Sequence, residues 1–365
     1  MAKDFIVAIE LGSSKMTGIA GRKNPDGSIS ILAVAKEDSA SYIRKGVAYN
    51  IERTAQGLSN IVSKLKNTLK TEIEQVYVGI GGQSIHSVKN SIVKELPLDC
   101  IVSQDMVNEL MDTNRSMEYK DCEILDAITQ EYNVDGHYED DPVGIQARHL
   151  EGNFLNVLWR RSFYRNLNKS LDNSGIKVAE MYLAPLTMAD CVLTDAEKRA
   201  GCVLVDLGAD TTTVSVYYRN KLRHIAVLPL GGSNVTKDLE SLQIDEINAE
   251  AMKLKHASAL TDEKDIDADA TLPIGDGRTI RSCMFIQVVE ARMLEIVENV
   301  KYLVPHEFAD KLLGGIVLTG GGSNMKNVEK LFHEVFDVEK VRIAKSTTLN
   351  INKKDSEVIL SEDGT

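Results

Sequence analysis

The sequence is short of the features that mark secreted, metal-binding or membrane-spanning proteins. Its five cysteines are widely spaced and none lies in a CxxC pair, so neither a disulfide framework nor a zinc site is indicated, and a reducing cytosol fits best. No run approaches about 18 uninterrupted apolar residues, so no membrane-spanning helix is expected. The N-terminal run MAKDFIVAIELG is interrupted by Glu10 and predicts a first strand rather than a signal peptide.

Positive charge is also scarce. Lysine and arginine total 42 against 54 aspartates and glutamates, which gives a formal net charge of -12. Such a chain repels phosphate backbones and anionic membrane surfaces, so nucleic acid is not expected as a partner. With 43% apolar residues, 7 prolines and 25 glycines in 365 residues, the composition is that of a globular protein, and the length predicts two or three domains.

A short internal repeat is the most informative feature of the sequence. Residues 5–20, FIVAIELGSSKMTGIA, and residues 202–217, CVLVDLGADTTTVSVY, both run from an apolar stretch through an acid, a glycine and hydroxyl residues to a second apolar stretch. The two segments align without a gap. Each predicts a β-hairpin, with buried parallel-type runs at Ile6–Ile9 and Val203–Val205 and a glycine that permits the tight reversal.

The two predicted turns have the chemistry of a phosphate site. A glycine turn exposes backbone N–H groups beside hydroxyls, and such a nest of donors suits phosphate oxygens. An acid at the end of the preceding strand, Glu10 in one copy and Asp206 in the other, can hold Mg²⁺ through water. Either copy alone is more simply a glycine turn in a sheet, but the pair in register favours a clamp on one polyphosphate.

Two further segments fit beside such a clamp. Ile316–Thr319 predicts a strand that leads through Gly320–Gly322 into a helix, where a flat ring could approach the backbone and the helix start offers free N–H groups. A flexible connection is the alternative. Glu250 and Lys253 lie three apart on a predicted helix, so they share a face and could contact a ribose or adenine edge, or form an ordinary ion pair. No Walker A loop occurs.

The rest of the chain alternates helices and strands. Residues 83–160 read as an inserted α+β module, with strands at IHSVKNSIV, EILDAITQEYNV and GNFLNVLWR and a helix that opens at Ser103. Residues 233–285 predict two helices and an acidic surface excursion, LTDEKDIDADATLPIGDG. After Val341 the chain is polar and has no amphipathic helix. Periodicity elsewhere predicts helices at 54–69, 162–173 and 285–304 and a strand at 76–80.

These segments resemble the actin-like ATPase superfamily and, within it, the FtsA family of bacterial cell-division proteins. The similarity is carried by IELGSSKMTGI, VYVGIGGQSIHSVKNSI, SQDMVNELM, DPVGIQARHLEG, VLVDLGADTTTVSVY, LPLGGSNVTKDL and IVLTGGGSNMKNVEKLF, in that order over roughly residues 4–345. It implies an α/β, two-lobed fold of duplicated ribonuclease H-like domains with an inserted α+β subdomain. The implied divisions are subdomain 1A at 1–82 and 161–199, 1C at 83–160, 2A at 200–232 and 286–340, 2B at 233–285, and a polar tail at 341–365 that starts a final 1A segment and looks truncated.

The resemblance also implies a set of ATP and Mg²⁺ contacts. Glu10 and Asp206 would face the metal. The first phosphate loop would be Gly12, Ser13, Ser14 and Lys15, and the second Gly208, Thr211, Thr212 and Thr213. Ribose and adenine would lie among Gly231, Gly232, Glu250, Lys253, Gly321, Gly322 and Ser323.

Two departures from the superfamily bear on catalysis. Many of its ATPases have Asp where this chain has Glu10, and no Gln or Glu near Ala189 is placed to orient an attacking water. Phosphoryl transfer depends chiefly on positioning and charge neutralisation, so these departures predict slow or negligible hydrolysis and leave the catalytic residues unassigned. ATP would then act mainly as a structural switch.

The resemblance implies a cytoplasmic adaptor that polymerises and works at the inner membrane of the division site. It would bind the tail of FtsZ through subdomain 2B and other divisome proteins through 1C. The family's membrane tether is a C-terminal amphipathic helix, which this chain lacks. Two alternatives stay open: a small-molecule, sugar-type kinase of the same superfamily, and a pilus-assembly adaptor with the same core.

Overall fold

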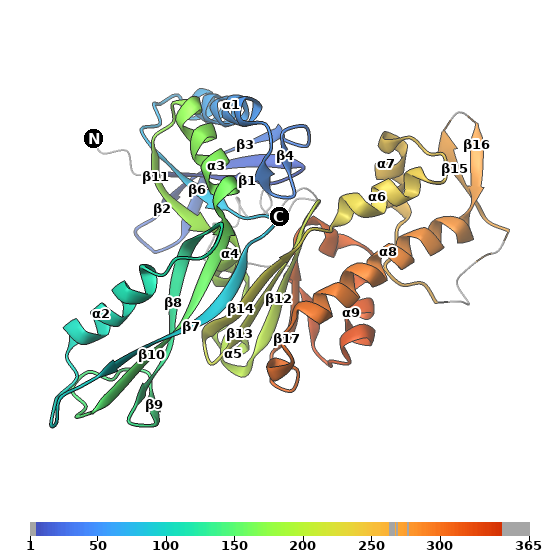
Figure 1. Ribbon diagram of the computed structural model, residues 1–365. Helices are drawn as coiled ribbons and strands as arrows, with labels where there is room; N and C mark the ends of the chain where they lie inside the picture. The colour runs from blue at the N-terminus through green and yellow to red at the C-terminus, as the bar shows by residue number, and fades with distance from the viewer. Residues whose placement is uncertain (1–4, 263–266, 268, 276, 345–365) are drawn as a thin grey trace.

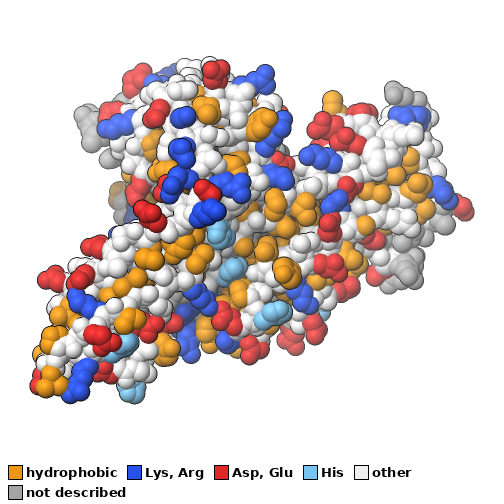
Figure 2. All heavy atoms as spheres, viewed as in Figure 1, with side chains coloured by type: hydrophobic (Ala, Val, Ile, Leu, Met, Phe, Trp, Pro, Cys, Tyr) orange, Lys and Arg blue, Asp and Glu red, His pale blue; other side chains and the backbone are white. Residues whose placement is uncertain are grey.

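The computed structural model describes residues 5–262, 267, 269–275 and 277–344. The ribbon shows two lobes, each built on a β-sheet, and an arm of strands and one helix that extends below the first lobe (Figure 1). In the space-filling view the same arm projects away from both lobes (Figure 2). No helix in the described part of the chain is long and apolar enough to cross a membrane.

The sheet of the first lobe has the order β11-β6-β1-β2-β3. β1 pairs with β2 in antiparallel fashion and with β6 in parallel, and β2 and β3 are antiparallel. β11 runs parallel to β6. The strands are β1 Ile6–Leu11, β2 Lys15–Lys23, β3 Ile29–Asp38, β6 Val76–Ile80 and β11 Val178–Leu183.

The second lobe repeats this arrangement in the order β18-β17-β12-β13-β14. The register repeats too, because Glu10 lies opposite Thr17 in the first hairpin and Asp206 lies opposite Thr213 in the second. The gap-free repeat in the sequence is therefore a duplication of the fold, as predicted. Its strands are β12 Cys202–Leu207, β13 Thr212–Tyr218, β14 Lys221–Leu228, β17 Gly315–Thr319 and β18 Val341–Ile343.

The two first strands differ in burial. β12 is buried along nearly its whole length, as expected, whereas β1 alternates between buried and exposed residues. The prediction of a buried run at Ile6–Ile9 is wrong, because Ile6 is 59% exposed and Ala8 is also exposed. Within the described residues this face of β1 is open, while Val7 and Ile9 on the other face enter the core.

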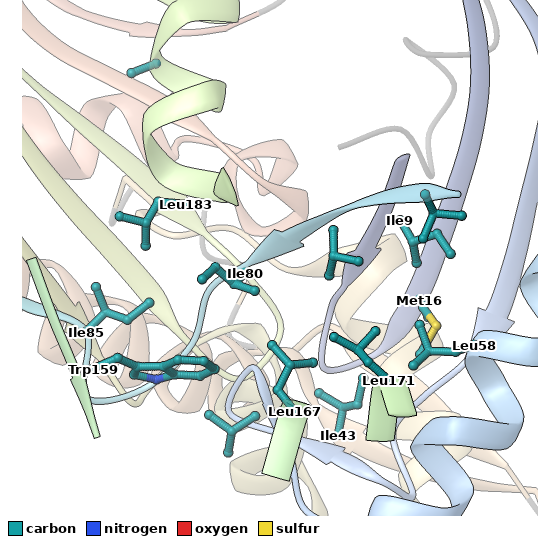
Figure 3. Packing of buried hydrophobic residues seen from close by; sticks show 14 of the residues in the cluster. Ile9, Met16, Ile43, Leu58, Ile80, Ile85, Trp159, Leu167, Leu171 and Leu183 are labelled. Carbon is teal, nitrogen blue, oxygen red and sulfur yellow. The ribbon is translucent and has the colours of Figure 1, made fainter. Parts of the chain in front are cut away.

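Helices cover the other face of the first sheet. α1 (Ile51–Leu69) begins at Asn50, whose side chain accepts the Arg53 N–H, and it buries a stripe that includes Leu58. α3 (Arg161–Ser174) packs beside α1, and α4 (Ala184–Val192) follows β11. Figure 3 shows the resulting core, in which Leu58 lies near Met16 and Leu171 near Ile43. The helices predicted at 54–69 and 162–173 are confirmed.

The second lobe has its own core and a smaller outer part. The long helix α8 (Ser282–Leu303) confirms the one predicted at 285–304. The remaining helices are α5 (Asp195–Ala200), α6 (Gly232–Glu240), α7 (Glu246–His256) and α9 (Val328–Phe336). The hairpin of β15 (Thr271–Gly275) and β16 (Arg278–Arg281) was not predicted, and part of the acidic excursion lies outside the described residues, as does the tail after residue 344.

The inserted module has the predicted α+β character. α2 (Gln104–Arg115) begins at Ser103, whose hydroxyl accepts the Met106 N–H. It packs on an antiparallel sheet ordered β7-β10-β8-β9. The strands are β7 (His86–Glu95), β8 (Cys122–Val134), β9 (His137–Glu139), which was not predicted, and β10 (His149–Arg160).

The insert joins the sheet of the second lobe. β7 pairs with β14 at His86 and Ala226, which makes one nine-stranded sheet. Ser87 Oγ accepts the Ile225 N–H at 3.0 Å. Side chains add to this seam, because Arg223 donates to Glu131 Oε2 at 2.9 Å and to Gln130 Oε1 at 3.1 Å, and Lys221 pairs with Asp140 at 2.6 Å.

Removing the largely buried charge of Arg223 from this seam should destabilise the protein. Arg223 is 12% exposed, so Arg223→Gln leaves Glu131 without its cation and should lower the free energy of unfolding by about 1.5–3 kcal/mol. Urea unfolding measures the change. The control is Arg115→Gln on the exposed end of α2, expected to change stability by less than about 0.5 kcal/mol. Equal effects of the two substitutions would contradict the role given to the seam.

Candidate functional site

The first glycine turn joins β1 to β2. A Cβ on Gly12 would lie 2.5 Å from the Lys15 carbonyl oxygen, so only glycine fits this reversal. The turn is held from behind: the Ser39 hydroxyl donates to the Gly12 carbonyl at 2.6 Å, and Ser13 Oγ accepts the Gly46 N–H at 2.8 Å. Ser13 is buried and Ser14 is exposed, so Ser14 is the more accessible of the two predicted serines.

The second turn joins β12 to β13 in the same way. A Cβ on Gly208 would lie 2.8 Å from the Thr211 carbonyl oxygen, and the Gly208 N–H donates to that same oxygen. Thr212 is fully buried and its hydroxyl donates to Leu230 O at 2.9 Å, while Thr213 is also buried. Thr211 is the half-exposed member of the three predicted threonines.

The two turns approach each other where the lobes meet, at a place that we term the cleft. The Lys45 N–H, on the turn between the short strands β4 (Ile43–Arg44) and β5 (Val47–Ala48), donates to Asp210 Oδ2 of the second turn at 3.0 Å. Sequence reasoning missed Lys45, Gly46 and Asp210. The only signal for them was a glycine after two basic residues in RKGVAYN, and an acid within the second repeat.

The acids at the ends of β1 and β12 are close enough to influence each other. Enclosure in protein, and to a smaller extent the negative charge of Glu10, raise the pKa of Asp206 to about 7. Part of the Glu10 side chain is accessible to solvent, but the surrounding protein reduces its hydration. This desolvation raises the pKa of its carboxyl, and the positive charge of Lys15 opposes the increase. A cation between the two carboxylates would stabilise the charged form of each and so lower both pKa values.

The start of α6 and one face of α7 lie beside the second turn. The Gly232 N–H donates to Gly208 O at 3.0 Å. Lys253 Nζ donates to Gly232 O at 3.2 Å and to Glu250 Oε2 at 2.6 Å, so the predicted shared face is present. Thr236 also donates to Glu250 Oε2, at 2.5 Å. In this structure the ion pair ties α7 to the start of α6, and it places both side chains next to the backbone of the second turn.

The third glycine segment packs against the end of β12. Gly320 has φ +82, and a Cβ there would collide with Asp206 Oδ1, so glycine lets this loop approach the acid. Gly321 is exposed and Gly322 half-exposed. The Ser323 side chain is buried and donates to Gly320 O at 2.7 Å, so its hydroxyl closes the loop.

The helix predicted to start at these glycines begins later. Gly321–Asn324 form a 3₁₀ turn, Met325 is extended, and α9 starts at Val328. The reason is a competing pairing: Lys326 bridges to Ser258, and the Ala259 N–H donates to Lys326 O at 2.8 Å. The free N–H groups of a long helix are therefore not presented at the glycines, although the open backbone is.

Metal ligands in this cleft are few. Among the residues that the structure describes, no group of three or more His, Cys, Asp or Glu side chains could hold a metal ion. Glu10 and Asp206 are only two carboxylates. They match the chemistry of Mg²⁺, which keeps several waters and is commonly shared between one or two carboxylates and phosphate oxygens.

Two duplicated α/β lobes, with a glycine turn and an acid from each meeting across a cleft, define an actin-like ATPase fold. Solved structures agree on the fold. A "PilM-PilN type IV pilus biogenesis complex" matches with a TM-score of 0.64 at 14% identity and covers 98% of this chain and 95% of that one. MreB5 of Spiroplasma citri bound to ADP matches with a TM-score of 0.56 at 14% identity, covering 94% and 92%.

Sequence comparisons identify the family within that fold. The model for "Cell division protein FtsA" matches residues 203–359, and the model for "SHS2 domain inserted in FTSA" matches residues 82–158. FtsA of Porphyromonas gingivalis is 33% identical over 354 residues, which cover 94% of this chain and 74% of that protein. FtsA of Neisseria meningitidis is 29% identical, covering 92% and 82%. The chain belongs to the FtsA family of cell-division proteins.

The shared charge of the cleft makes stability depend on pH. Asp206 keeps its proton up to about pH 7 in the folded protein but releases it near its ordinary pKa of 3.8 when unfolded. The folded state thus binds more protons between these values, so this acid lowers stability progressively as pH rises and fully above pH 7. Asp206→Asn should therefore be more stable than the wild type at pH 8 and similar to it near pH 4.

Urea unfolding of the ligand-free protein at both pH values tests this expectation. The matched control is Asp172→Asn on α3, an exposed carboxylate outside the cleft. Its stability relative to the wild type should not change with pH in this way. A constant difference between Asp206→Asn and the wild type across the range would contradict the coupling.

Proposed function

We propose that this chain binds ATP with Mg²⁺ in the cleft and serves as a nucleotide-dependent adaptor in cell division. The observation that carries the proposal is the pair of acids, Glu10 and Asp206, each beside a glycine turn and each with a raised pKa. Such a pair favours a divalent cation, and the adjacent turns favour the phosphates that accompany it. The MreB5 structures with this fold are described as bound to ADP and to AMPPNP, which supports the same reading.

The proposal assigns a role to each predicted group. Mg²⁺, when bound, would neutralise charge on the phosphates, and Glu10 and Asp206 would hold it through water. Ser14 and Thr211 are the accessible hydroxyls of the two turns. The first phosphate loop would comprise Gly12, Ser13, Ser14 and Lys15, the second Gly208, Thr211, Thr212 and Thr213, and the nucleoside would lie among Gly231, Gly232, Glu250, Lys253, Gly321, Gly322 and Ser323.

We expect this cleft to bind ATP tightly and to hydrolyse it slowly. In α4, which follows β11, Ala189 is fully buried, Met188 has no hydrogen-bonding group suited to orient a water, and Asp190 is paired with Lys198 Nζ at 2.6 Å. Electrostatic preorganisation around the phosphates without such a group gives tight binding and slow turnover. The bound nucleotide then acts by holding the lobes together.

Residues 233–285, proposed as subdomain 2B, would bind the FtsZ tail. α7 supports this assignment with two large apolar side chains on one stripe, Ile247 at 83% and Leu254 at 77% exposed. They lie seven residues apart, which is two helical turns, and Ala251 between them is exposed as well. An apolar stripe of this kind suits the hydrophobic residues of a short peptide.

The proposed subdomain 1C, residues 83–160, would contact other divisome proteins or a second copy in a filament. Figure 2 shows hydrophobic side chains at the far end of the insert. Leu98 and Ile101, 65% and 61% exposed, lie in the loop between β7 and α2. The membrane link would come from a C-terminal amphipathic helix of the kind that the family resemblance implies, at the cytoplasmic face of the inner membrane.

Nucleotide binding should depend on the acid and on the bare backbone. Asp206→Ala removes one of two cation-facing carboxylates, and Gly322→Trp fills the loop at Leu207, so each should weaken ATP binding by about a hundredfold. A fluorescent ATP analogue with Mg²⁺ measures the affinity. The control is Asp172→Ala on α3, which should bind normally. Normal affinity in both cleft variants would show that the site is misassigned.

Co-sedimentation with FtsZ filaments tests the cell-division role. The wild-type chain should pellet with FtsZ, and Leu254→Glu should pellet much less because it places a charge in the apolar stripe. The matched control is Leu98→Glu in the loop between β7 and α2, also well exposed (65% against 77% for Leu254) but outside residues 233–285. ATP binding without FtsZ binding would favour the kinase or pilus-adaptor alternatives.

A further inference from the structure

The turn between β4 and β5 has a backbone conformation that its surroundings must hold. Two residues, Lys45 and Gly46, connect the paired strands, and both are left-handed, with φ +51 and φ +71. Glycine adopts such angles freely, whereas for lysine they are unfavourable. An unfavourable residue of this kind persists where neighbouring groups fix it, so the contacts of this turn are informative.

Both glycine turns of the cleft contact this β4–β5 turn. The Gly46 N–H donates to Ser13 Oγ of the first glycine turn at 2.8 Å. The Lys45 N–H donates to Asp210 Oδ2 of the second glycine turn at 3.0 Å. Two adjacent N–H groups therefore connect a turn of the first lobe to a turn of the second.

The start of the insert contacts the β4–β5 turn as well. The Gln83 N–H donates to Lys45 O at 2.8 Å. A Cβ on Gly46 would lie 2.4 Å from Gly82 Cα, and a Cβ on Gly82 would lie 2.5 Å from Gly46 O. The two backbones touch without an intervening side chain, so a shift of the turn must also move Gly82 and Gln83.

Gln83 is tied to the rest of the insert in two ways. Trp159, in β10, is 2% exposed, and its Nε1 donates to Gln83 O at 3.1 Å. Three residues after Gln83, His86 begins β7 and pairs with Ala226 of β14 in the second lobe. The peptide groups of Gln83 thus link the β4–β5 turn to both ends of the insert.

The second lobe holds Asp210 and the seam in one sheet. β13 begins at Thr212, two residues after Asp210, and pairs with β14, with Thr212 opposite Leu228 and Val214 opposite Ala226. A shift of the second glycine turn relative to the first lobe must therefore change the contact of Asp210 with Lys45 or the pairing at His86. Such a closed set of contacts can couple the cleft to the insert.

We propose that the β4–β5 turn is a relay between the second glycine turn and the start of the insert, with Asp210 as the positioning residue that holds it. Asp210 is half-exposed and precedes Thr211 in the proposed second phosphate loop. A phosphate bound there would bring a second negative charge to the Asp210 carboxylate, and repulsion would release the Lys45 N–H. This phosphate step rests on the function proposed for the cleft, and the phosphates would then join the two glycine turns in place of Asp210.

Hydrogen exchange in the ligand-free full chain tests the relay without nucleotide. Mass spectrometry follows exchange in peptides that cover Lys45 and Gln83. The variants are Asp210→Ala and Asp210→Asn, because asparagine keeps an oxygen that can accept the Lys45 N–H, whereas alanine removes it. The matched control is Asp172→Ala on α3, an exposed carboxylate outside the cleft.

Asp210→Ala should speed exchange about tenfold at Lys45 and several-fold at Gln83. The effect at Gln83 is the diagnostic one, because its N–H donates to Lys45 rather than to Asp210. Asp210→Asn should keep both rates close to those of the wild type, and Asp172→Ala should change neither.

Three results in the ligand-free protein would overturn the relay. The first is wild-type exchange at Lys45 in Asp210→Ala, which would show that the carboxylate does not hold the turn. The second is faster exchange at Lys45 with wild-type exchange at Gln83, which would show that the insert does not respond. The third is an equal effect of Asp210→Ala and Asp210→Asn, which would show that the accepting oxygen is not what matters.

Addition of ATP and Mg²⁺ tests the phosphate step separately. ATP should speed exchange at Lys45 and Gln83 in the wild type and cause no further increase in Asp210→Ala. Failure of the wild type to bind a fluorescent ATP analogue would refute the function proposed for the cleft, whereas the relay is decided by the ligand-free exchange. Binding of the analogue without faster exchange at Gln83 would overturn the phosphate step.

Discussion

The repulsion between the carboxylates of Glu10 and Asp206 is the interaction that determines what the rest of the cleft is suited to bind. Each acid ends the first strand of its lobe, and the symmetry of the duplication brings the two ends together. Enclosure raises the pKa of both carboxyls, so two negative charges side by side are unfavourable here, and a hydrated cation between them would offset that cost. The glycine turns beside them supply donors rather than acceptors, which makes a cation accompanied by phosphate a better match than a cation alone.

The cleft also requires the backbone of its loops to turn tightly and to approach neighbouring groups closely, and this explains where the chain uses glycine. Gly12 and Gly208 permit equivalent reversals, and Gly320 lets a third loop touch the carboxyl end of β12. Small polar groups then fix these loops from behind. Ser39, Ser13, Thr212 and Ser323 all direct their hydroxyls to backbone groups rather than to the cleft. Part of what the sequence presents as ligand-binding hydroxyls is therefore scaffold, and the family relationship is compatible with both uses.

The duplication, the inserted module and the main helices could be predicted because each depends on local pattern: a gap-free repeat, a capping serine at Ser103, a stripe of apolar residues on α1. The errors arose where distant pairing decides. α9 starts late because Lys326 pairs with Ser258, and β1 is half exposed because burial depends on what covers a sheet. Lys45 and Asp210 were missed for the same reason, since a hydrogen bond between residues 165 positions apart leaves no trace in spacing.

The pairing of β7 with β14 has a mechanical consequence. The insert is covalently part of the first lobe, yet its strands continue the sheet of the second. It therefore connects the two lobes and resists their movement relative to each other. If the lobes separate, one possibility is that the chain bends where the insert leaves the first lobe, near Gly82 and Arg160. The other is that the contacts of Ser87 with Ile225 and of Arg223 with Glu131 break. The insert therefore responds to the relative position of the two lobes, although none of the residues proposed to bind nucleotide belongs to it.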